Sequence, residues 1–63
     1  MKSGLQMALE LIELRQAYQE KQRDSAVAAH NYGSAASYEG IAVGLMMAAK
    51  IIKEEIKRDE LCQ

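Results

Sequence analysis

The chain contains no proline, and its one cluster of turn-forming residues, Asn31-Tyr32-Gly33-Ser34, lies at the middle of its 63 residues. Proline interrupts helices most strongly, so the sequence predicts two long uninterrupted segments joined by a single turn. Both segments are rich in Ala, Leu, Ile, Met, Glu, Lys and Gln, which are residues typical of helices rather than strands. The sequence therefore predicts an all-α fold, an antiparallel two-helix hairpin that forms a single domain.

The first helix is expected at residues 4–30. Ser3 and Gln6 have the S-x-x-Q spacing of a capping box, in which each side chain binds a backbone amide of the other residue. An alternative is a break near Asp24 and Ser25, where Ser25 would cap a short third helix. The polar stretch from Gln16 to Arg23 contains no Gly or Pro and consists of good helix formers, which favours one continuous helix.

The turn is expected at residues 31–34, because Asn31 or Gly33 accommodates the left-handed conformation that ends many helices. The second helix is expected at residues 35–59. The candidates for its N-cap are Ser34 and Ser37.

Apolar residues recur in each helix at alternating intervals of four and three residues, which is the spacing of a heptad seam. The pattern of the first helix is Met7, Leu11, Leu14 and Tyr18, continued by Lys21, Ser25 and Ala28. The pattern of the second helix is Tyr38, Ala42, Leu45, Ala49, Ile52 and Ile56. These two lines predict the faces along which the helices pack.

Small residues recur at every fourth position of the second helix, at Ala36, Gly40, Gly44 and Ala48. Glycine destabilises a helix by about 0.5–1 kcal/mol relative to Ala, so its presence predicts close helix packing in the hairpin or its dimer. A groove for a ligand or a target helix is the alternative. The residues expected to pack in the core or the oligomer are Leu11, Leu14, Tyr18, Tyr38, Gly40, Gly44, Leu45, Ala48, Ala49, Ile52 and Ile56.

A chain this short rarely forms a sufficient core without a disulfide, a metal or a partner. Cys62 is the only cysteine and His30 the only histidine, so neither a disulfide nor a structural zinc site is expected within one chain. The apolar stripes are also wider than one neighbouring helix covers. The sequence therefore predicts a homodimeric four-helix bundle or a higher helical oligomer.

Several functional classes are not expected from this sequence. His30 and Cys62 are predicted at opposite ends of the hairpin, so they form no catalytic pair, and the chain is expected to be neither an enzyme nor a cofactor or metal protein. A net charge of −1 argues against binding to duplex DNA. The apolar run 41–49 is shorter than a membrane span and no signal peptide is apparent, so a cytoplasmic protein is expected.

The expected function is that of a small oligomeric helical interaction protein, an inhibitor or adaptor that binds another protein. The alternatives are a sponge that sequesters a small nucleotide-like signal between subunits, and an RNA-binding regulator. Arg residues recognise carboxylates and phosphates, and tyrosines are frequent in binding sites. The candidate partner or ligand contacts are Arg15, Arg23, His30 and Tyr32.

Residues 31–45 read NYGSAASYEGIAVGL and are followed by Ala48, Ala49, Ile51 and Ile52. This half of the chain resembles the short helical-hairpin accessory proteins of bacteriophages and prophages, whose second helix often starts with Tyr-Glu-Gly. The resemblance implies a phage accessory protein, a class that includes inhibitors of host enzymes and defence systems. With it, the expected function becomes that of a phage-type accessory inhibitor or adaptor that binds a host protein. In length and layout the chain is also similar to plasmid copy-number regulators that bind RNA as two-helix dimers, but it lacks a corresponding basic surface.

Overall fold

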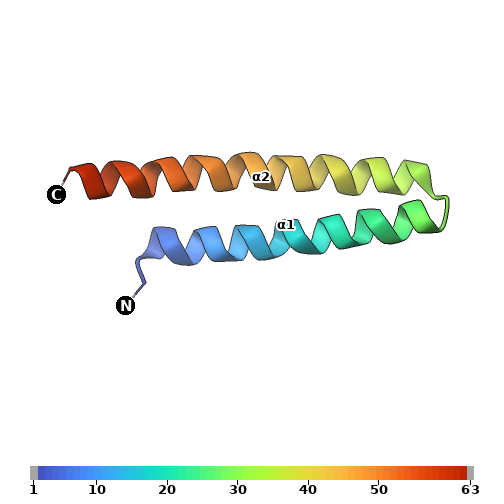
Figure 1. Ribbon diagram of the computed structural model, residues 1–63, viewed down its shortest axis with the longest axis horizontal. Helices are drawn as coiled ribbons and strands as arrows, with labels where there is room; N and C mark the ends of the chain where they lie inside the picture. Colours follow the sequence, from blue (N-terminus) through green and yellow to red (C-terminus); the bar gives the residue numbers. More distant parts are fainter. Residues whose placement is uncertain (1, 63) are drawn as a thin grey trace.

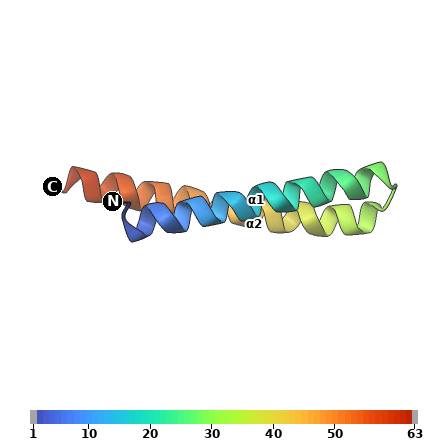
Figure 2. The same ribbon diagram turned by 90° about the horizontal axis from the view of Figure 1, so that it is seen from below.

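The computed structural model describes residues 2–62, which form two antiparallel α-helices joined by one tight turn (Figure 1). Helix α1 covers Gly4–Ala28 and helix α2 covers Tyr32–Leu61. The two lie side by side along the length of α1 in both views (Figure 2), and the molecule measures 50 × 19 × 11 Å. Helix α1 continues through Asp24 and Ser25. The all-helical hairpin is therefore confirmed, and the three-helix alternative was wrong.

Helix α1 begins where the sequence predicts. The backbone N–H of Gln6 donates to Ser3 Oγ at 3.1 Å, and the Ser3 N–H donates to Gln6 Oε1 at 3.0 Å. Both halves of the capping box are thus present. They satisfy two of the amide groups that a helix N-terminus leaves without intrahelical partners.

The turn is shorter than expected and is centred on His30. The Asn31 N–H donates to the Ala26 carbonyl at 2.8 Å and the His30 N–H to the Val27 carbonyl at 3.0 Å, which together form a Schellman motif. His30 has φ = 58°, so it occupies the left-handed position expected for Asn31 or Gly33. Histidine is one of the non-glycine residues that adopt this region comparatively often.

Asn31 caps α2, in place of Ser34 or Ser37. Its side-chain oxygen accepts from the Ser34 N–H at 3.3 Å, and Asn is as favourable an N-cap as Ser. Helix α2 therefore begins three residues earlier than expected. Ser37 lies inside the helix, where its hydroxyl donates to the Gly33 carbonyl.

The seam of α2, the line of residues that faces α1, agrees with the sequence pattern. Its three buried residues are Ala35, Ala42 and Ala49, spaced seven apart. Half-buried residues complete the seam at Tyr38, Leu45, Ile52 and Ile56. Alanine at every seventh position allows close approach of the two helices. It also leaves a core in which no large side chain among residues 2–62 is buried.

The seam of α1 differs from the predicted one by two positions. Half-buried residues recur along this seam at intervals of four and three, at Leu5, Leu9, Ile12, Gln16, Gln19, Arg23 and Ala26. A shift of two positions rotates the contact line by about 200° around the helix, to its opposite side. The apolar pattern indicated the wrong side because three of the true seam residues are polar.

The two observed seams match each other in an antiparallel register in which facing residue numbers sum to 61. Leu5 then faces Ile56, and both of these side chains line one hollow at the open end of the hairpin. At the other end, Ala26 faces Ala35. The ion pair between Arg23 and Glu39, whose numbers sum to 62, agrees closely with this register.

Candidate interaction surface

A line of large apolar side chains is exposed on the side of α1 opposite its seam. These residues are Met7, Leu11, Leu14 and Tyr18, which are 53–69% exposed. They were expected to pack in the core or the oligomer. They do not pack within the hairpin, because the seam of α1 that runs from Leu5 to Ala26 faces α2 in their place. We call this line the α1 stripe.

A second apolar line lies on the outer side of α2, and we call it the α2 stripe. Its members are Gly40, Gly44, Met47 and Ile51, all exposed. A Cβ added at Gly40 or Gly44 would meet no atom within 4 Å, so these glycines do not serve helix packing inside the hairpin. Their expected close packing was therefore wrong for the hairpin and stays a prediction for the oligomer. The α2 stripe is flanked by further exposed apolar residues at Ile41 and Val43.

The exposed surface is larger than that of a typical folded monomer of this mass. The chain of 7.0 kDa exposes 4888 Å². The scaling of surface with mass gives about 4,000 Å² for a monomeric globular protein of this size. The difference is comparable to the ~800 Å² that each partner buries in a standard protein interface.

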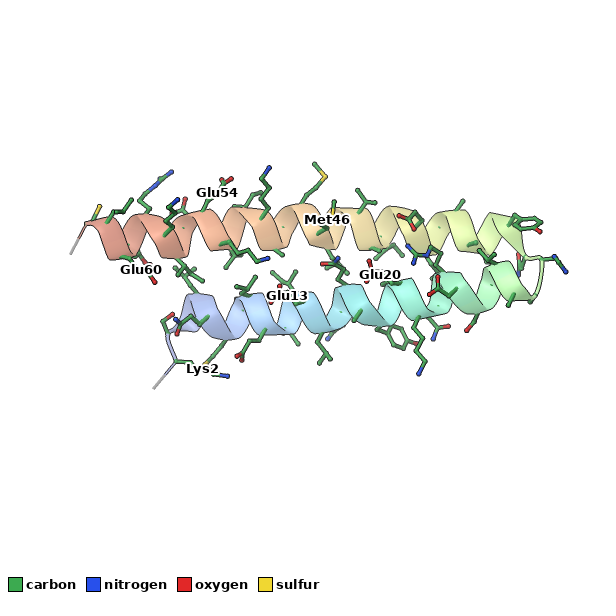
Figure 3. All side chains as sticks on the ribbon, viewed as in Figure 1. Lys2, Glu13, Glu20, Met46, Glu54 and Glu60 are labelled. Carbon is green, nitrogen blue, oxygen red and sulfur yellow. The ribbon has the colours of Figure 1, made fainter. Side chains whose placement is uncertain are left out.

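One broad face of the hairpin carries the ion pairs that connect the helices, and we call it the ion-pair face. Arg23 Nη1 lies 2.5 Å from Glu39 Oε2, and Lys53 Nζ lies 3.4 Å from Glu13 Oε2. Glu13 and Glu20 extend from α1 on the side towards α2 (Figure 3). The hydrogen bond to Glu39, and then that to Asp24, raise the pKa of Arg23 above its ordinary value.

The four candidate ligand contacts do not converge on one site. Arg23 is engaged by Glu39 and Asp24, whereas Arg15 is exposed and forms no ion pair within residues 2–62. His30 and Tyr32 lie beside the turn with ring centroids 6.1 Å apart at 64°, in an edge-to-face arrangement. Eight residues of α1 separate the two arginines, a rise of about 12 Å.

His30 and Cys62 lie at the two ends of the long axis, at the turn and at the C-terminal end of α2 (Figure 1). Within residues 2–62, no three His, Cys, Asp or Glu side chains form a group that could hold a metal ion. Helix α2 is long and apolar enough to cross a membrane by length and composition, a property that core helices of soluble proteins share.

Comparison with known proteins adds no relative: no family model, curated protein or solved structure matches the chain. The resemblance to phage helical-hairpin proteins therefore stays a prediction. The physical features that characterise this molecule are its two exposed apolar stripes and its small alanine core.

Proposed function

We propose that this protein is a small helical interaction protein that self-associates and binds another protein as an inhibitor or adaptor. The supporting observation is the distribution of apolar residues: the core consists of three alanines, while the large aliphatic side chains of the α1 stripe are more than half exposed. Apolar surface of this extent marks an interaction site in soluble proteins.

Self-association is supported by the size of the core as well as by the exposed surface. Burial of an apolar side chain contributes about 25 cal/mol per Å² to stability, and alanine has little area to bury. A partner that covers the stripes would bury more apolar surface and so increase the free energy of unfolding. Because every chain in solution carries the same stripes, a second copy is always available as that partner.

Sedimentation velocity and far-UV circular dichroism over a dilution series test self-association. We expect an oligomer whose helicity and melting temperature fall on dilution, because dissociation and unfolding are coupled in such proteins. A folded monomer with a melting temperature independent of concentration would contradict the proposal.

Affinity capture from a bacterial lysate tests the binding of a second protein. We expect the wild type to retain a partner at high salt and the variant Leu14→Lys to lose it, whereas Arg15→Ala keeps it. A nucleotide found by native mass spectrometry, or binding abolished by Arg15→Ala with a steep salt dependence, would favour the sponge or RNA alternative instead.

A further inference from the structure

We propose that the α1 stripe of one copy packs antiparallel on the α2 stripe of the next copy, so that the hairpins associate head to tail. This inference rests on the proposed self-association and specifies its geometry. Contacts between two different surfaces of the same chain generate rings or open chains rather than closed dimers.

The two stripes have the same spacing and the same length. The α1 stripe runs from Met7 to Tyr18 at intervals of 4, 3 and 4, and the α2 stripe runs from Gly40 to Ile51 at the same intervals. The sequence 4-3-4 is unchanged when read backwards. An antiparallel pairing in which residue numbers sum to 58 therefore places each member of one stripe opposite a member of the other.

Side-chain sizes in this register are complementary. Tyr18 falls opposite Gly40 and Leu14 opposite Gly44, where open space surrounds each glycine. The largest side chain thus faces a position with no side chain. In the other half of the stripe, Leu11 falls opposite Met47. Such knob-into-hole contacts give helix interfaces the packing density of protein interiors.

Charges at the border of the stripes agree with the same register. Glu10 lies three residues before Glu13, and Lys50 lies three residues before Lys53, the two members of an interhelical ion pair. Both Glu10 and Lys50 therefore border the ion-pair face. In the head-to-tail register, Glu10 of one copy, which pairs with Lys2 of its own chain, lies within two residues of Lys50 of the next. Lys50 forms no ion pair within residues 2–62 of its own hairpin.

The symmetric alternative packs the α1 stripe against the α1 stripe of a second copy. The 4-3-4 spacing also permits that pairing, with residue numbers that sum to 25. It would bring Glu10 of one copy within two residues of Glu13 of the other on the same face, an approach of like charges that the head-to-tail register avoids. Helix α2 would also remain uncovered.

Two complementary variants test the arrangement. Leu14→Lys disables the α1 stripe and Gly44→Lys disables the α2 stripe, while Met46→Lys is the matched control on the ion-pair face. Met46 is exposed and lies between Glu39 and Lys53 at intervals of seven residues. Light scattering after size exclusion gives the mass of each variant and of the equimolar mixture.

We expect Leu14→Lys and Gly44→Lys each to have the mass of one chain, and their mixture to have the mass of two. The intact α1 stripe of one variant then binds the intact α2 stripe of the other, and growth stops at the pair. Met46→Lys keeps the mass of the wild type. If either variant is unfolded alone, circular dichroism of the mixture still reports the pairing as recovered helix.

Three results would overturn the head-to-tail arrangement. If Gly44→Lys associates like the wild type while Leu14→Lys does not, the α1 stripe pairs with itself. If the wild type associates but the mixture stays at the mass of one chain, the geometry is wrong and self-association stands. A wild type that is monomeric at all concentrations contradicts both the geometry and the proposed function.

Discussion

Arg23 of α1 and Glu39 of α2 form an ion pair across the hairpin, with Nη1 of the arginine 2.5 Å from Oε2 of the glutamate. The same guanidinium lies 3.0 Å from Asp24 Oδ1 through its Nη2. Arg23 occupies a seam position of α1 that lies outside the line predicted from the apolar pattern. Its charged group therefore reaches the ion-pair face while its aliphatic stem lies between the helices.

We expect a small coupling between Arg23 and Glu39 in a double-mutant cycle of Arg23→Met and Glu39→Gln, because both side chains are partly exposed to solvent. The coupling should decrease as salt is added. Thermal melts of the four proteins at equal concentration measure it. A large coupling that is independent of salt would contradict this expectation.

The raised pKa of Arg23 predicts the pH dependence of this contribution. A cation whose pKa is higher in the folded state adds stability that is fully present below the unfolded pKa and is lost as pH rises through the folded value. The pKa of an arginine lies far above neutrality in both the folded and the unfolded state. Raising the pH from neutral to mildly alkaline should therefore leave the effect of Arg23→Met on the melting temperature unchanged.

Gln19 is a second polar residue of the α1 seam, and its buried Oε1 accepts no hydrogen bond from residues 2–62. A buried acceptor without a partner destabilises by about 1–3 kcal/mol. Gln19→Leu should therefore raise the free energy of unfolding by about that amount, as measured by denaturant titration at fixed chain concentration. Gln16→Leu, in the same seam, is the control and should have a smaller effect. A Gln19→Leu protein less stable than wild type would contradict the burial of an unpaired amide.

His30 adopts φ = 58° at the end of α1, and its Nδ1 lies 3.1 Å from the Tyr32 hydroxyl oxygen. The left-handed conformation costs an L-residue about 1 kcal/mol relative to glycine. We expect His30→Gly to raise the melting temperature, His30→Asn to leave it nearly unchanged and His30→Val to lower it, because a β-branched residue disfavours this region. A melting temperature higher for His30→Val than for His30→Gly would show that the turn does not require positive φ.

Ala42 is 3% exposed at the centre of the α2 seam, opposite Gln19 in the register of the hairpin. Ala42→Leu adds volume where the helices are close, and overpacking of this kind costs about 1–3 kcal/mol. The exposed position Ala36 is the control, since Ala36→Leu has a similar change in helix propensity. Equal melting temperatures for the two variants would contradict the close approach of α1 and α2 at Ala42.

Local signals in the sequence predicted the helices and their contact line on α2. The Ser3–Gln6 capping box starts α1 at the expected residue, because both partners lie within one turn of helix. The heptad pattern around Ala42 and Ala49 correctly indicated the seam of α2. The end of α1 was harder to predict, because His30, Asn31 and Gly33 are all compatible with a turn. The backbone hydrogen bonds of the structure show that His30 is the left-handed residue.

The sequence by itself determined an all-helical hairpin, because capping, helix propensity and the absence of proline act between residues close in the chain. Only the tertiary structure decided which side of α1 meets α2. Helix α1 carries two heptad lines, one through Leu11 and one through Leu9 that continues into Gln16 and Arg23. The register with the alanines of α2 and the ion pair to Glu39 select the second line. The more apolar line is thereby left on the surface of the hairpin, where its large side chains are more than half exposed.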